Sequence, residues 1–232
     1  MKRLIGILAV LGVLLAAGQM LLPPVVSQLV SQGMKSQTGS DQVSVQLEKK
    51  PALGMLGGSF DKITLSAVNA KTDKLTFSEL NGVMTDVQLD RNALLEHQTI
   101  VLQSVGNVQV VGTLTEAELA RYLNQSVKGI RNAAVAITPD KVTASSSFAI
   151  GNFANVGITL EGRIAVDSQK VKFVTERFLI NNTVVGNIGG AALTEIPLLD
   201  LKKLPFGVTV RDVVMEQGKV VIYTDNQGGS GK

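Results

Sequence analysis

Few residues of this 232-residue chain have the types and spacing that catalysis or metal binding requires. The absence of cysteine excludes disulfides, thiolate catalysis, cysteine-bound zinc and iron–sulfur clusters. One histidine, His97, makes a site with several histidine ligands impossible. No Gly-x-Ser-x-Gly motif supplies a nucleophile for it, and we expect His97 on the surface in a polar turn. The sequence therefore predicts no metal centre and no cofactor.

Two carboxylate pairs are the remaining candidates for acid–base chemistry. Asp86 and Asp90 alternate with apolar residues, as on the wet face of a strand. Glu116 and Glu118 fall in the first turn of an expected helix, where negative charge is favourable. Because each pair has this simpler structural explanation, we expect a protein that is not an enzyme. A carboxylate-dependent hydrolase acting on a cell-wall polymer is the distant alternative.

The glycine cluster Gly54-Met55-Leu56-Gly57-Gly58 lacks the Gly-Lys-Ser/Thr ending of a phosphate-binding loop. It favours a bent turn or a bulge, with a loop that contacts a lipid headgroup as the lesser alternative. Together with Leu53, the side chains of Met55 and Leu56 suggest a second hypothesis, in which this turn is an exposed apolar tip that touches a membrane.

The composition is that of a folded, apolar chain. Charged residues make up 18%, aromatic residues 4% and hydrophobic residues 45%, whereas disordered or nucleic-acid-binding chains are rich in charge. The formal net charge of +3 includes Lys2 and Arg3, so a chain without them would carry +1. No run of five like charges occurs, and nucleic acid is not an expected partner.

The N-terminus has the pattern of a secretory signal or a membrane anchor. Met1-Lys2-Arg3 precedes an apolar run from Leu4 to Leu22. Ala16-Ala17-Gly18 offers a cleavage point, but the run continues almost long enough to span a bilayer. We expect export to the periplasm or another extracytoplasmic space, with residues 4–22 either removed or retained as an anchor in the inner membrane.

Two helices are expected in the exported part. Val26, Leu29, Val30 and Met34 recur at helical spacing after Pro23-Pro24. The second helix, Thr115–Val127, opens with a capping box and carries an apolar stripe.

Most of the remaining chain alternates apolar and polar residues with a period of two, as strands with one wet face do. Val83, Thr85, Val87 and Leu89 are expected on one face of such a strand. The longest segment, Val156–Asp167, is expected to pair with Lys170–Ile180. Ala191–Leu204 is expected to hold short helical turns around Pro197, and Val208–Val214 pairs with Val220–Thr224 as a hairpin.

These elements predict a β-rich α+β fold, in which a long, strongly curved antiparallel sheet wraps around the amphipathic helix. The predicted organisation is a signal peptide or anchor over residues 1–24, one domain over residues 25–226 and a flexible tail over residues 227–232.

Two stretches resemble a known family. Pro51–Ala67 resembles the glycine turn and following strand of the LmeA-like bacterial phospholipid-binding proteins, and Gly112–Leu123 resembles their helix-opening motif. The resemblance extends over roughly Pro24–Tyr223. It implies a fold similar to tubular lipid-binding domains, with an apolar tunnel and a role in holding or carrying phospholipid in the cell envelope. It brings no catalytic residues with it.

The expected lipid-binding site is an apolar face rather than a motif. Its candidate lining residues come from the capped helix and the later strands: Leu119, Leu123, Val127, Val156, Ile158, Leu160, Phe173, Phe178 and Phe206. Small residues such as Ala67 and Gly162 are expected to leave room beside them. The candidate cations for a lipid phosphate are Arg121, Lys128, Lys202 and Lys203.

The sequence thus predicts an extracytoplasmic protein that binds phospholipid acyl chains, with a membrane surface as a further partner and lipid transfer as the task that such binding would serve. The alternative is a structural or adaptor protein of the envelope whose apolar residues form an ordinary filled core.

Overall fold

The computed structural model describes residues 21–36, 38–72, 75–97, 99–127, 130–150, 154–167, 169–185, 194–203 and 206–227. Most of the predicted signal or anchor, the candidate cation Lys128 and nearly all of the predicted tail lie outside the described residues.

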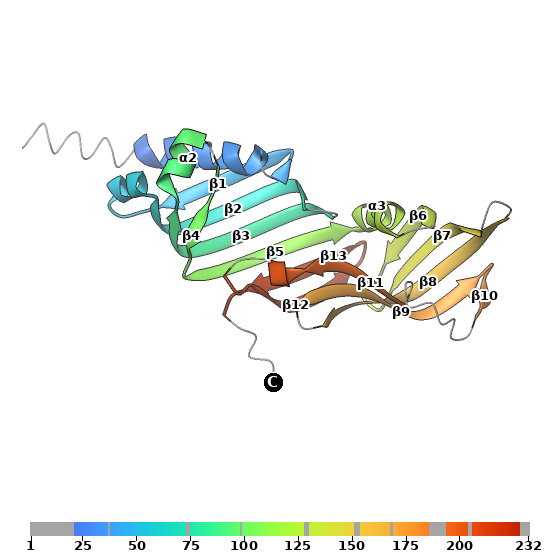
Figure 1. The fold of residues 1–232 in the computed structure, drawn as a ribbon. Coiled ribbons are helices and arrows are strands. Elements are labelled where there is room, and N and C mark those ends of the chain that lie inside the picture. Colours follow the sequence, from blue (N-terminus) through green and yellow to red (C-terminus); the bar gives the residue numbers. More distant parts are fainter. Residues whose placement is uncertain are drawn as a thin grey trace, which may run out of the picture. The chain divides into compact units, whose positions relative to one another are not determined.

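The described chain is a β-rich α+β fold with helical residues at 21–36, which confirms the predicted fold class (Figure 1). The first half contains β1 (Gln42–Glu48), η1 (Ala52–Gly57), β2 (Ser59–Lys71), β3 (Thr76–Leu89), α2 (Arg91–His97), β4 (Leu102–Ser104) and β5 (Asn107–Thr115). The second half contains α3 (Glu116–Ser126), β6 (Ile130–Ile137), β7 (Val142–Ile150), β8 (Ala154–Asp167), β9 (Lys170–Ile180), β10 (Thr183–Val184), β11 (Glu195–Asp200), η2 (Leu201–Lys203), β12 (Thr209–Glu216) and β13 (Lys219–Asp225).

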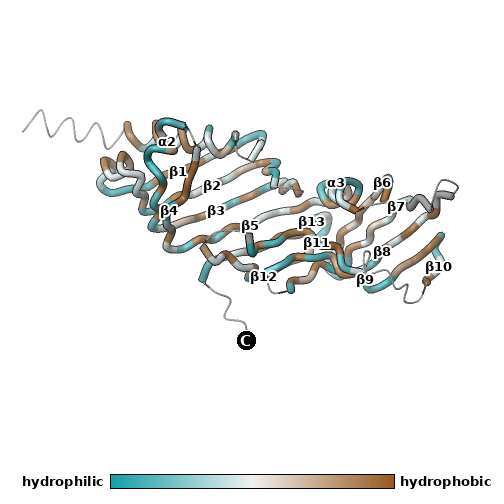
Figure 2. Tube along the Cα trace, in the orientation of Figure 1, coloured by the Kyte–Doolittle hydropathy of each residue, from teal (hydrophilic) through white to brown (hydrophobic). Residues whose placement is uncertain are grey.

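The strands form two sheets. A seven-stranded sheet has the order β1-β2-β3-β5-β13-β12, with β4 paired to β3. A six-stranded sheet has the order β10-β9-β8-β7-β6, with β11 paired to β9. Figure 2 shows apolar and polar residues alternating along many of these strands, as one-sided burial requires.

The chain divides into two compact units. Unit 1 comprises Met1–Val68 and Asn81–Gln109, and unit 2 comprises Asn69–Leu80 and Val110–Lys232. Strands β2, β3 and β5 contribute residues to both units. That residues 25–226 act as one domain stays a prediction.

Unit 1 has its own apolar core. Val26 and Val30 of the N-terminal helical segment pack with strand residues such as Leu47 and Ile63. The expected alternation in β3 is wrong at one point, because Met84 rather than Val83 packs against this core. Asp86 has a positive φ of 52° and interrupts the alternation between Met84 and Val87.

Two short helices in unit 1 were not expected from the apolar pattern. Asp90 caps α2, since its Oδ1 accepts hydrogen bonds from the backbone N–H groups of Asn92 (2.9 Å) and Ala93 (3.0 Å). These bonds, led by that from Ala93, lower the pKa of the Asp90 carboxyl. His97 is exposed, as expected, but it lies in the last turn of α2 rather than in an isolated polar turn.

In unit 2, the predicted capping box opens α3. The Glu118 N–H donates to Thr115 Oγ1 (3.4 Å), and the Thr115 N–H donates to Glu118 Oε2 (3.2 Å). Glu116 Oε1 accepts from the backbone N–H of Ile137 in β6 (2.8 Å). Both glutamates of the second carboxylate pair are therefore held by backbone groups around α3.

We expect Thr115→Ala to lower the free energy of unfolding by about 1 kcal/mol, because it removes the hydroxyl that satisfies the N–H at the third helical position. Urea denaturation of the purified protein measures this change. Thr115→Ser keeps the hydroxyl and should restore most of the loss. Equal losses for both variants would contradict a capping role.

A short helical turn is found within the expected range Ala191–Leu204, at η2, but the expectation is wrong at Pro197 itself, which lies within β11. β11 pairs only with β9 among the described strands, and its register shifts between Pro197 and Leu199. An edge strand with a bulge tolerates proline, since the missing N–H is not needed for a ladder on both sides.

Candidate functional site

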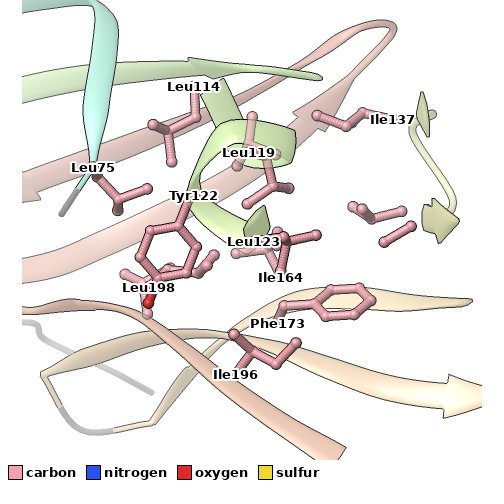
Figure 3. Close-up of a cluster of buried hydrophobic side chains, with 14 of the residues drawn as sticks. Leu75, Leu114, Leu119, Tyr122, Leu123, Ile137, Ile164, Phe173, Ile196 and Leu198 are labelled. Carbon is pink, nitrogen blue, oxygen red and sulfur yellow. The ribbon is translucent and has the colours of Figure 1, made fainter. Parts of the chain in front are cut away.

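The apolar core of unit 2 is built around α3. Leu119, Tyr122 and Leu123 are 2%, 5% and 2% exposed, respectively. They belong to one buried cluster with residues from both sheets, including Leu114 of β5 in the seven-stranded sheet and Phe173 of β9 in the six-stranded sheet (Figure 3). Because α3 presents its apolar stripe to this cluster, the predicted packing of an apolar sheet face against the capped helix is observed within unit 2.

Tyr122 also fixes α3 to β11. Its hydroxyl donates to the backbone carbonyl of Pro197. Burial raises the pKa of this phenol, so the group stays protonated and remains a donor through the neutral pH range. Sequence reasoning left Tyr122 out of the lining residues, although it lies on the apolar stripe of the predicted helix.

The structure brings together seven of the nine predicted lining residues. Five are buried members of the cluster, and two are partly buried and packed against it: Leu119, Leu123, Ile158, Leu160 and Phe173, and then Val127 and Phe178. Val156 and Phe206 are half-buried and lie outside the cluster. Phe206 has a positive φ of 65° in a turn before β12. That these residues contact lipid stays a prediction.

On one face of the six-stranded sheet, the burial of the side chains changes along the length of the strands. On β8, Val156, Ile158 and Leu160 share a face by strand alternation. On β9, Phe178 pairs with Leu160 and Ile180 pairs with Ile158, so they share this face. We call the face of β7, β8 and β9 that carries these residues the inner face.

The inner face is closed at one end and partly open at the other. Leu160 and Ile158 are 1% and 5% exposed, whereas Val156, Phe178 and Ile180 are half-buried. Ser146 of β7, which pairs with Ile158, is also half-buried and places a hydroxyl on this face. An apolar surface therefore extends from the core under α3 toward solvent-accessible side chains.

The opposite face of β8 and β9, which we call the outer face, carries charged side chains that form ion pairs. Glu161 forms ion pairs with Lys141 (2.9 Å) and Arg177 (3.1 Å). The hydrogen bond from Lys141, assisted by attraction to Lys141 and Arg177, lowers the pKa of Glu161. This carboxylate therefore stays ionised at neutral pH, and the outer face remains suited to water rather than to acyl chains.

The expectation that Gly162 leaves room for a ligand is wrong. A Cβ at this position would lie 1.9 Å from the carbonyl oxygen of Val174 on the neighbouring strand. The register of β8 and β9 shifts between Glu161 and Gly162, which marks a bulge. Glycine is required here because the two backbones approach closely. A larger residue at position 162 would therefore disturb the strand pairing rather than fill a lipid-binding space.

The structure describes the side chains of two of the four candidate cations. Arg121 of α3 and Lys202 of η2 are exposed. Lys203 belongs to η2, but its side chain, like Lys128, is outside what the structure describes. In the described parts of the chain, no group of three or more His, Cys, Asp or Glu residues is arranged to hold a metal ion.

The glycine cluster forms a turn of 3₁₀-helix, η1, which ends at Gly58 in the left-handed conformation with a φ of 78°. A side chain at Gly58 would clash with the carbonyl oxygen of Leu89. The hypothesis of an exposed apolar tip fails for Met55, which is 3% exposed and packs in the core of unit 1. Leu53 and Leu56 are 39% and 48% exposed.

Among the residues that the structure describes, no helix has both the length and the apolar character needed to cross a membrane.

Comparison with known proteins identifies the family. The model of the LmeA-like phospholipid-binding family matches residues 17–225. No curated protein and no solved structure matches the chain significantly. The match covers most of the sequence, including α3 and every strand of the inner face. The chain therefore belongs to the LmeA-like phospholipid-binding family.

Proposed function

We propose that this protein is an extracytoplasmic phospholipid carrier, which holds acyl chains against the inner face and passes lipid between membranes during maintenance of the cell envelope. Family membership supports phospholipid binding. The observation that carries the proposed location of the site is the change in burial along β8 and β9, from Leu160 under α3 to half-buried Val156 and Ile180.

The proposed binding mechanism is desolvation of the acyl chain. Each methylene that leaves water contributes about 0.8 kcal/mol, so a few methylenes against Val156, Phe178 and Ile180 supply a substantial part of the affinity. This gain must also offset the lost freedom of the lipid. The headgroup remains near solvent, where few polar groups such as the Ser146 hydroxyl contact it, and headgroup selectivity is accordingly weak.

The proposed location outside the cytoplasm derives from the N-terminal sequence. Lys2 and Arg3 followed by the apolar run Leu4–Leu22 favour export, with this run either cleaved or retained in the inner membrane. A retained run would keep the carrier close to one membrane, which is the proposed donor or acceptor of the lipid.

The proposal is tested by substituting, one at a time, two neighbouring residues whose side chains lie on opposite faces of β9. Ile180 lies on the inner face, whereas Leu179 pairs with Thr159 on the outer face, and both are half-buried. We expect Ile180→Asp to weaken phospholipid binding at least about tenfold, because a carboxylate replaces an apolar contact along the acyl chain. Leu179→Asp introduces the same charge one residue away and should leave binding nearly unchanged.

Native mass spectrometry, followed by extraction and identification of the lipid, measures occupancy in the unmodified protein and both variants. Thermal unfolding of each variant checks that the fold is retained. Co-purifying phospholipid that is lost only from Ile180→Asp supports the proposed site. Equal occupancy in both variants contradicts this position for the site, and an unmodified protein that neither contains nor takes up phospholipid contradicts the proposed function.

A further inference from the structure

The exposed stripe of the N-terminal helical segment changes character along its length. Leu21 and Val25, one turn apart, are 65% and 57% exposed. Further along the same stripe, exposed Gln28, Gln32 and Lys35 replace them. Val26 and Val30 on the opposite side are buried in the core of unit 1. The exposed side is therefore apolar only at the N-terminal end of this helix, where the N-terminal apolar run ends.

A second element of unit 1 also exposes leucines. Leu53 and Leu56 are three residues apart in η1, and residues at this spacing lie on one side of a 3₁₀-helix. Met55, between them, is buried in the same core as Val26, which follows Val25. Figure 1 shows η1, the short helix between β1 and β2, at the end of unit 1 where the N-terminal helical segment begins.

We propose that Leu21, Val25, Leu53 and Leu56 form a docking surface that inserts into the interface of a phospholipid bilayer. Single exposed apolar residues are common on protein surfaces, but here four of them come from two elements that share one core. The bilayer is the occupant that fits, because the apolar run Leu4–Leu22 leads directly into this surface. This inference rests on the proposed membrane association of residues 4–22, and it is independent of lipid binding at the inner face.

The charges near η1 suit a membrane surface without dominating the contact. Lys50, two residues before the first residue of η1, is exposed. Neighbouring Lys49 pairs with Asp61 at 2.7 Å, and Asp61 Oδ2 also accepts the backbone N–H of Lys50. Asp61 therefore compensates one of these two lysine charges, and apolar insertion rather than attraction of the exposed Lys50 ammonium to anionic lipid provides the main contribution to docking.

The absence of cysteine from the chain allows a direct test with single-cysteine variants. Leu56→Cys and Gln32→Cys of the full chain are labelled with an environment-sensitive fluorophore and added to vesicles of three parts phosphatidylcholine to one part phosphatidylglycerol. Gln32 is the matched control, because it lies on the exposed stripe about 16 Å beyond Leu21 at the rise of an α-helix. Leu53→Cys provides a second reading of η1.

We expect the label at Leu56 to shift to shorter wavelength and to lose most of its emission when the vesicle lipids carry a nitroxide on the acyl chain. The label at Gln32 should respond only to a water-soluble quencher. Vesicle flotation reports the membrane association of the chain separately. A chain that floats while its Leu56 label stays in water overturns the docking surface but leaves the anchor standing.

Two further outcomes also overturn the proposal. A label at Leu56 that is protected from both quenchers indicates contact with a second copy of the chain. A chain that does not float has neither anchor nor docking surface, whereas its phospholipid occupancy, measured by mass spectrometry, still decides the proposed carrier function.

Discussion

Gly162→Ala is expected to lower the free energy of unfolding by about 3 kcal/mol or more, which is large for the addition of one methyl group. The added Cβ would lie 1.9 Å from the Val174 carbonyl oxygen and 3.0 Å from the Thr175 Cα. Both atoms belong to the backbone of β9, so rotation of a side chain cannot relieve the overlap. The strands must separate where they pair Gly162 with Thr175.

Gly57→Ala is the matched control, because an added Cβ there has no neighbour within 4 Å. That substitution should be neutral or slightly stabilising, since alanine reduces the conformational freedom of the unfolded chain. Chemical denaturation of the two variants beside the unmodified protein measures the difference. A Gly162→Ala variant as stable as Gly57→Ala would mean that β8 and β9 do not approach each other as closely as the structure indicates.

The strand content of this chain was predictable because one-sided burial leaves a period-two pattern. The predicted segment Lys170–Ile180 has the bounds of β9, and the capping box at Thr115 marked the start of α3. The pattern was weaker for α2 and η1. These elements are short and bury few side chains, so their signals are local: the aspartate at position 90 before α2 and the glycine at position 58 after η1.

Bulges limited the prediction of faces and of the site. Phe173 and Phe178 are five residues apart, so strict alternation places them on opposite faces of β9. The register shift between Glu161 and Gly162 gives β9 one extra residue, Glu176, and both phenylalanines pack with the same cluster. The apolar pattern of β9 itself changes from odd to even positions across Glu176. That change was the sequence signal for the bulge, for Ile180 on the inner face and for the close approach at Gly162.

Substitution of the two phenylalanines of the predicted site, Phe173 and Phe178, is expected to have the second large effect on stability. Phe173 is 2% exposed within the cluster around α3, whereas Phe178 is half-buried and packs at its margin. We expect Phe173→Ala to lower the free energy of unfolding by about 3–5 kcal/mol, because it leaves a cavity in a closed core. Phe178→Ala should lower it by about 1–2 kcal/mol, since less apolar area is buried there.

Lipid binding should follow the opposite order, which separates residues that hold the fold from residues that hold the ligand. At a temperature where both variants remain folded, titration with a fluorescent phospholipid should show weaker binding for Phe178→Ala and little change for Phe173→Ala. The same order for stability and binding would show that Phe173 contacts the lipid and that the core under α3 opens to admit it. The proposed site would then have to extend beneath α3. Leu119 and Leu123 would then line the lipid-binding site, as the sequence analysis predicted.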